Sequence, residues 1–199
     1  MDNIIFLSDW KEEKDMLDEL IRDLQERGYT ENDVAEASKR VLEYFDIDQV
    51  PVPIVSIAKK LGFRVYQQDM EDEMSGYIAV SKKWEEKFGT DKLVIVNAEH
   101  SMGHKRFTIA HELCHYLLDY KNRNKPYYDA YYSYLKNEPR EKRANQFAAS
   151  LLMPELQFID EFNIAKKTNC NVIAVLADKF GVSAKAIETR MEELKLDKE

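Results

Sequence analysis

The chain has 199 residues, 44% of them hydrophobic, which suffices for one well-packed domain with an appendage. Its formal net charge of -8 disfavours a general affinity for nucleic acid. The apolar run at residues 4–7 is too short for a signal peptide, and the sequence contains no stretch long enough to cross a membrane. Cys114 and Cys170 are too few for a disulfide framework. We therefore expect a cytoplasmic protein that does not contact a membrane.

The first segment, residues 1–50, is predicted to be a helical extension. One helix runs from about Asp9 to Arg27 and carries an apolar stripe formed by Leu17, Leu20, Ile21 and Leu24. Thr30 is predicted to cap a second helix. The two helices could pack on the rest of the chain, cover a cleft as a pro-segment would, or bind a partner. Packing is the commonest role of amphipathic helices.

Pro51 and Pro53 mark the start of a second segment, residues 51–165. A helix is predicted from about Ile54 to Leu61. Short strands are predicted near residues 63–67, 76–80 and 93–96. This order indicates an α+β fold with a small mixed or antiparallel sheet.

The motif H-E-x-x-H at residues 111–115 lies in an apolar run with helical spacing. Its two histidines are four residues apart on one helix face, so both imidazoles can reach one metal ion. Glu112 lies beside them, where it can take a proton from water on zinc. A chance occurrence on a solvated helix is the alternative. Apolar flanks predict instead a buried helix, whose histidines need partners.

A catalytic zinc site takes three protein ligands and leaves one position open. A second helix is predicted from Pro139 to near Pro154, with an apolar stripe that includes Ala144 and Phe147. Glu141 lies in its first turn and is the predicted third ligand. The alternative for Glu141 is a charge stabilised by the helix dipole.

Three further polar residues are expected near this site. Asn145 shares the helix face of Glu141 and could accept a hydrogen bond from His111. Asp119 follows His115 by four residues and could orient that ring, although a solvated aspartate at a helix end is an equal alternative. We expect His104 to lie near the site without being a ligand, because three ligands are already assigned.

Two runs carry a family resemblance: RFTIAHELCHYLL at residues 106–118 and EKRANQFAASLLMP at residues 141–154. They resemble the ImmA/IrrE family of metallopeptidases, and weaker likeness extends from about Pro51 to the C-terminus. The resemblance implies a zincin-like core, with zinc on His111, His115 and Glu141 and with Glu112 as general base. Cys114 stands where the family often has glycine. Its thiol either fills space in the core or is an oxidation-sensitive group near the metal.

Candidate substrate contacts come from a strand and from a tyrosine-rich stretch. Zinc peptidases of this kind hold an extended peptide against the edge of a small sheet, which suggests main-chain pairing at Gly76, Tyr77 and Ile78. An ordinary sheet strand is the alternative. The polar stretch after Pro126 could supply an oxyanion donor or line a pocket through Tyr127, Tyr128, Tyr131, Tyr132 or Tyr134.

The last segment, residues 166–199, contains two short predicted helices on either side of Gly181, with Ser183 capping the second. This helix-turn-helix pattern suggests a DNA-binding regulator as a rival function. The second helix, however, offers only Lys185 and Arg190 as basic residues, and groove binding usually needs more phosphate contacts. The family resemblance implies a structural or partner-docking role for this helix pair.

Together these features predict a cytoplasmic zinc endopeptidase that acts on a protein substrate. The resemblance implies a helix-turn-helix repressor of a mobile element, such as a prophage, or of a stress response. One alternative is an antirepressor that binds a repressor without cutting it, although such a protein would not need Glu112. The other is a DNA-binding regulator with a structural metal, which usually has four protein ligands. No direct contact with nucleic acid is expected.

Overall fold

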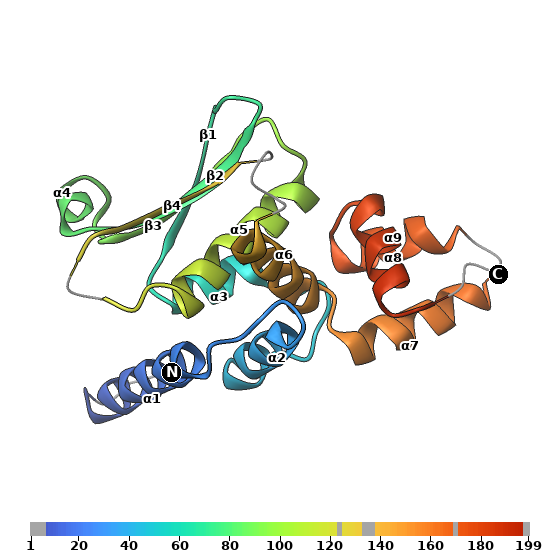
Figure 1. Ribbon diagram of the computed structural model, residues 1–199, viewed down its shortest axis with the longest axis horizontal. Coiled ribbons are helices and arrows are strands. Elements are labelled where there is room, and N and C mark those ends of the chain that lie inside the picture. Colours follow the sequence, from blue (N-terminus) through green and yellow to red (C-terminus); the bar gives the residue numbers. More distant parts are fainter. Residues whose placement is uncertain (1–6, 123–124, 133–137, 169–170, 197–199) are drawn as a thin grey trace, which may run out of the picture.

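The computed structural model describes residues 7–122, 125–132, 138–168 and 171–196. A sheet lies above a layer of helices, and the last helices of the chain form a lobe beside this layer (Figure 1). The architecture is α+β, as the sequence predicts. Tyr134 and Cys170, which entered the predictions above, lie outside the described residues.

The sheet contains β1 (Arg64–Gln68), β3 (Lys92–Asn97), β2 (Met74–Val80) and β4 (Tyr127–Tyr132), in that order across the sheet. β1 and β3 are parallel, whereas β2 is antiparallel to both of its neighbours. The three predicted strands are confirmed and the sheet is mixed. β4 was not predicted, because its sequence suggested a polar connecting stretch.

Helices α3 (Ile54–Lys60) and α5 (Met102–Leu118) contribute to the core on one face of the sheet. The strand residues buried in this core alternate along β2 and β3 and comprise Ile78, Val80, Val94 and Val96. Between β2 and β3 lie the short helices η1 (Lys82–Trp84) and α4 (Glu85–Phe88). The alternation fixes which face of β2 points at α5, the helix that carries H-E-x-x-H.

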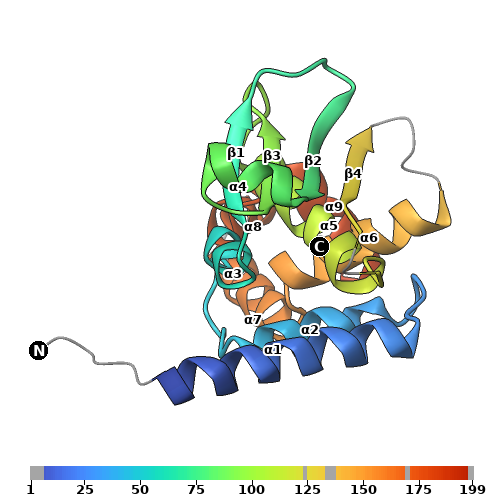
Figure 2. The ribbon, with the colours of Figure 1, turned by 90° about the vertical axis from the view of Figure 1, so that its left-hand side faces the viewer.

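The N-terminal helices α1 (Leu7–Arg27) and α2 (Val34–Tyr44) lie side by side beneath the rest of the molecule (Figure 2). The predicted stripe of α1 is buried at Leu20, Ile21 and Leu24. Gln25 also donates a hydrogen bond to the carbonyl oxygen of Tyr120 at 2.9 Å, just after α5. The extension therefore packs on the helix layer, the first of the three roles considered for it.

The prediction that Thr30 caps α2 is wrong, because the helix begins only at Val34 and Asp33 precedes it. The backbone N–H and the hydroxyl of Thr30 both donate to the Asp33 carboxylate, at 2.6 and 2.7 Å. Thr30 is thus a donor in a turn and not the acceptor of a helix cap. Short polar side chains near a helix start often form local hydrogen bonds of this kind in place of a helix cap.

The second half of the chain forms α6 (Pro139–Leu152), α7 (Glu155–Lys166), α8 (Val172–Phe180) and α9 (Ala184–Glu193). The predicted α8–α9 pair is confirmed. Gly181 ends α8 with a φ of 63°, and the hydroxyl of Ser183 accepts the N–H of Ala186 at 3.1 Å. α7 was not predicted, although it buries Phe158, Phe162 and Ala165 at helical spacing.

Arg106 ties the α8–α9 pair to α5. Its guanidinium donates to the carbonyl oxygens of Gly181 at 2.9 Å and of Val52 at 2.8 Å. One turn earlier, Gly103 lies so close to the α8–α9 turn that a Cβ would come within 2.9 Å of the carbonyl carbon of Val182. The pair is therefore docked against the start of α5.

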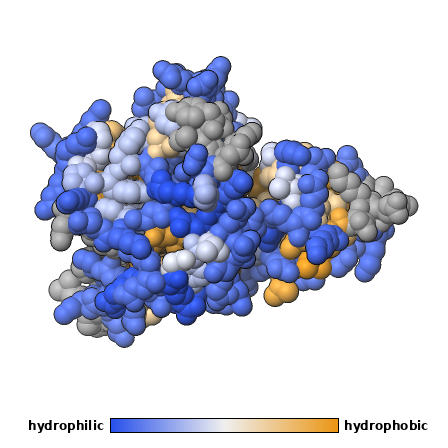
Figure 3. Space-filling view, in the orientation of Figure 1, coloured by the Kyte–Doolittle hydropathy of each residue, from blue (hydrophilic) through white to orange (hydrophobic). Residues whose placement is uncertain are grey.

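The visible surface is largely hydrophilic, with an apolar patch over α7 (Figure 3). Leu156 and Ile164 of that helix are exposed. Within the part of the chain that the structure describes, no helix has both the length and the apolar composition needed to cross a bilayer.

Substituting Gly76 by alanine should destabilise the fold by about 2–3 kcal/mol, because overpacking at a rigid backbone contact is costly. A Cβ at Gly76 would lie 2.6 Å from the carbonyl oxygen of Ile95 and 2.7 Å from Cγ2 of Thr108 on α5. Urea unfolding measures the loss. Gly28→Ala is the control, because its Cβ meets nothing within 4 Å and only its left-handed backbone costs about 1 kcal/mol. Equal losses for the two variants would contradict the close packing.

Candidate metal centre

The two histidines of the motif point to the same place from α5. Ser101 starts this helix by accepting the N–H of His104, and the turns from Thr108 onward are buried. His111 and His115 are both buried, and their Nε2 atoms lie 3.1 Å apart. Histidines so close in a dry environment need a shared partner, since neither Nε2 can reach water.

That shared partner is Glu141, from the first turn of α6. Pro139 starts α6, and the packing of α5 against α6 brings the carboxylate between the rings. Its Oε2 lies 3.0 Å from Nε2 of His111, and its Oε1 lies 3.4 Å from Nε2 of His115. Burial acts to raise the pKa of Glu141, yet hydrogen bonds with both histidines hold it well below its ordinary value. The carboxylate is therefore kept charged.

The spacing of these three side chains suits one metal ion. Ligand atoms bound about 2.0–2.1 Å from a tetrahedral zinc ion lie about 3.3–3.4 Å from one another. The observed separations of 3.1, 3.0 and 3.4 Å are close to that value. His111, His115 and Glu141 are all buried and could hold a metal ion between them.

The outer nitrogen of each ring is also held. Nδ1 of His111 lies 2.9 Å from Oδ1 of Asn145, and Nδ1 of His115 lies 2.9 Å from Oδ2 of Asp119. An acceptor at Nδ1 places the proton there and leaves Nε2 free to bind a metal. The structure thus places Asn145 and Asp119 where the sequence predicted them.

Glu112 adjoins the cluster without being part of it. The side chain is completely buried and has no side-chain hydrogen bond or ion pair among the described residues. A backbone hydrogen bond from Tyr131 on β4 lowers its pKa, but by less than burial raises it. Burial raises the pKa of Glu112 well above its ordinary value, and the charges of Asp129 and Glu141 add to the rise. A buried carboxylate without a side-chain partner is costly, and such groups are typical of sites that act on a proton. The residues present therefore fit a catalytic metal site.

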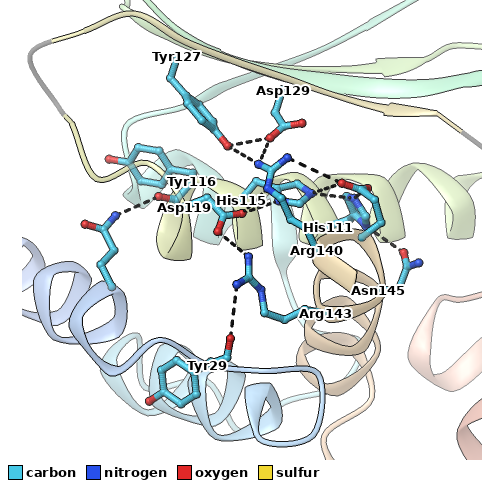
Figure 4. A network of polar contacts seen from close by, with 12 residues as sticks. Tyr29, His111, His115, Tyr116, Asp119, Tyr127, Asp129, Arg140, Arg143 and Asn145 are labelled. Carbon is cyan, nitrogen blue, oxygen red and sulfur yellow. Dashed lines mark hydrogen bonds and ion pairs between the residues drawn. The ribbon is translucent and has the colours of Figure 1, made fainter. Parts of the chain in front are cut away.

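Two arginines of α6 surround the ligands with ion pairs, and the sequence did not point to either (Figure 4). Arg143 pairs with Oδ1 of Asp119 and donates to the carbonyl oxygen of Tyr29 at 3.4 Å. Arg140 pairs with Oδ2 of Asp119 at 2.9 Å and with Asp129 of β4. Burial acts to raise the pKa of Asp119, but the hydrogen bond with His115 and the two arginines lower it to about 2. The carboxylate that orients His115 is thus fixed by three partners.

The predicted substrate strand is not at an edge of the sheet. β2 pairs with β3 on one side and with β4 on the other, so its backbone has no free edge in this conformation. Ile78 is buried in the core under the sheet, and Gly76 is packed against α5. Tyr77 is half-buried and contacts the ring of Tyr128. In this conformation β4, the stretch taken as polar connection, occupies the edge of β2, so peptide pairing at these three residues stays a prediction that requires β4 to separate from β2.

His104 and Cys114 lie on α5 but are not part of the ligand cluster. The Nε2 atom of His104 lies 3.2 Å from the hydroxyl of Ser75, and its ring stacks on His100, so His104 is outside the ligand cluster. Cys114 is fully buried, and burial raises the pKa of its thiol. A neutral, enclosed thiol fits the packing role considered for it.

Comparisons with known proteins show the family and a similar fold. A family model described as the IrrE N-terminal-like domain matches residues 58–192. The chain belongs to the ImmA/IrrE family of peptidases. A search of curated proteins finds no match. Among solved structures, a Mycobacterium tuberculosis transcriptional regulator is similar in fold, with a TM-score of 0.53 and 17% identity over 86% of this chain. The chain spans about half of that protein, since 51% of it is covered.

In this ImmA/IrrE chain, replacing either orienting residue should weaken metal binding. We expect Asn145→Ala and Asp119→Ala each to lower zinc affinity about 10–100-fold, because the imidazoles lose the acceptor that fixes their tautomer. Competition with a zinc-sensitive dye measures the affinity. The neighbouring Gln146→Ala is the control, because Gln146 contacts Glu193 and not a histidine. An affinity unchanged in all three variants would show that the contacts at Nδ1 do not support the site.

Proposed function

We propose that this protein is a zinc-dependent endopeptidase that cleaves a helix-turn-helix repressor. The observation that carries the proposal is a fully buried Glu112, without a side-chain partner among the described residues, beside a His–His–Glu cluster spaced for one metal ion. Membership of a peptidase family supports the reaction class. A site built only for structure would satisfy such a carboxylate or replace it.

His111, His115 and Glu141 would hold the zinc ion. When bound, zinc supplies Lewis acidity toward a water molecule and a peptide carbonyl group. Glu112 would accept a proton from the attacking water and return it to the leaving amine. Asn145 and Asp119 would keep both imidazoles in the metal-binding tautomer.

The regulatory substrate is proposed from two supports. The chain belongs to the ImmA/IrrE family, for which a repressor substrate was expected from the sequence. The similar structure from Mycobacterium tuberculosis is described as a transcriptional regulator, although the likeness itself concerns the fold. Both supports favour a protein of gene regulation over a general peptide substrate.

The DNA-binding alternative has little support from α9. Arg190 is buried and donates to the carbonyl oxygen of Met153 at 3.2 Å and to Glu193 at 3.0 Å. Of the two basic residues on this helix, only Lys185 faces solvent. Because phosphate contacts supply most of the affinity for duplex DNA, one exposed lysine that already pairs with Glu188, on a chain of net charge -8, is a poor anchor.

Glu112→Gln should retain zinc and lose about 10²–10⁴-fold in cleavage rate, as expected for removal of a general base. Elemental analysis gives the zinc content, and incubation with candidate repressors from the same genome, followed by mass spectrometry, gives the cleavage rate. Glu138→Gln is the matched control, since Glu138 is exposed and precedes α6. If both proteins bind a repressor without cutting it, the antirepressor alternative replaces the peptidase. If neither binds zinc, the metal assignment fails.

The purified protein should not retard duplex DNA in a gel at about 50 mM salt, a condition that favours phosphate contacts. Lys185→Glu should give the same result, since the proposed function does not use this residue. A complex that forms with the wild type, weakens with Lys185→Glu and dissociates with rising salt would support the DNA-binding alternative instead.

A further inference from the structure

β4 covers the metal ligands. The ring of Tyr131 stacks on that of His111, with centroids 3.9 Å apart and planes at 24°. Under this cover His111 and Glu112 are 0% exposed, His115 is 1% exposed and Glu141 is 5% exposed. A peptide bond cannot approach side chains that solvent cannot touch. The conformation described is therefore closed to a substrate.

β4 also occupies a particular place in the sheet. β4 follows α5, the helix that carries H-E-x-x-H, in the chain. It pairs antiparallel with β2, and the pairing runs from Val80 opposite Tyr127 to Met74 opposite Tyr132. β1, β2 and β3 all precede the metal helix, and without β4 the strand β2 would be the edge of that sheet. The free edge of a sheet is the surface to which an extended peptide adds by main-chain hydrogen bonds. β4 is thus the edge strand of the sheet, and it occupies the edge of β2 that an extended peptide would otherwise use.

Besides the stacking of Tyr131 on His111, an arginine of α6 fastens β4 to the helices below it. Arg140 of α6 pairs with Asp129 and donates to the hydroxyl of Tyr127 at 2.9 Å, both on β4 (Figure 4). The same guanidinium pairs with Asp119 at the end of α5. Its side chain is 41% exposed, so water can replace these partners at a modest cost. The fastening is therefore reversible.

We propose that β4 takes the place of the substrate, and that it must leave the edge of β2 before an extended peptide can reach His111 and Glu112. Arg140 is the latch that sets how often β4 leaves. The proposal rests on the proposed peptidase function. It adds that the cleaved segment binds as a strand along β2, in the position that residues 127–132 hold in this structure.

A reversible cross-link between β2 and β4 tests this directly. Tyr77 and Ala130 are directly opposite each other and both are half-buried. Directly opposed antiparallel residues have Cα atoms about 4.5–5.5 Å apart, within the range that a disulfide spans. The test protein therefore carries Tyr77→Cys and Ala130→Cys, with Cys170→Ser to remove a thiol that could compete for the disulfide. The control carries Tyr77→Cys and Ile95→Cys, which joins β2 to β3 and leaves β4 free.

Three quantities are measured for each protein, oxidised and then reduced. They are the rate of zinc loss to an excess of EDTA, the rate of repressor cleavage, and the rate at which diethyl pyrocarbonate modifies His111 and His115 in the metal-free protein. Closing the β2–β4 disulfide should slow all three at least about tenfold, because the site opens only by local separation of β4. Reduction should restore them. The β2–β3 disulfide should change none of them.

Equal rates in the locked and unlocked β2–β4 protein would overturn the proposal, since the site would then be reached with β4 in place. Failure of the proposed function gives a different result. If the reduced protein binds no zinc or cuts no repressor, the peptidase assignment falls. Histidine modification would still show whether β4 controls access, because that measurement needs neither metal nor substrate.

Arg140→Gln tests the latch without a cross-link. Zinc loss to EDTA and histidine modification in the metal-free protein should both become about tenfold faster, as β4 separates more often. Lys39→Gln is the matched control, because Lys39 is exposed and has one ion pair, with Glu43, far from the site. Unchanged access in Arg140→Gln, with normal folding by circular dichroism, would remove Arg140 from the proposal.

Discussion

The burial of ionisable side chains between α5 and α6 is the constraint on which this structure depends. His111, Glu112, His115 and Glu141 are all removed from solvent, and polar groups without partners in such a place cost several kcal/mol. The ring nitrogens are satisfied by Asn145, Asp119 and Glu141, which fixes the two helices relative to each other. Glu112 has no side-chain partner among the described residues, so its burial is the uncompensated cost of this helix pair.

Support for this arrangement comes from parts of the chain distant in sequence. Arg143 joins Asp119 to the carbonyl oxygen of Tyr29, in the turn between α1 and α2. Arg106 joins α5 to the turn between α8 and α9. Partly buried ion pairs add little net stability, but they restrict geometry, which is what a metal site requires. The N-terminal extension and the C-terminal pair therefore act as braces on the two ends of the metal helix.

The sequence predicts those features of the site that depend on helical spacing. His111 and His115 are four residues apart, as are Glu141 and Asn145, so each pair follows from one local pattern. Helical spacing could not predict the roles of Arg140, Asp129 and Tyr131. Those roles depend on β4, which follows α5 in the chain and pairs with the edge of β2. α7 differs, since the apolar spacing of Phe158, Phe162 and Ala165 was visible in the sequence. Its position directly after Pro154 obscured it.

A closed site has a direct consequence for specificity. When the competent state is only a fraction of the population, the apparent affinity of every ligand falls by that fraction. A short peptide that pairs only with β2 forms no more main-chain hydrogen bonds than β4 already forms there. It therefore competes poorly with β4, which is tethered to the same chain and so has a high effective concentration. A folded repressor can add contacts elsewhere on the surface, and those contacts favour the open state if β4 would obstruct them. Under the proposed function, closure by β4 would therefore discriminate against short peptides without any specific pocket.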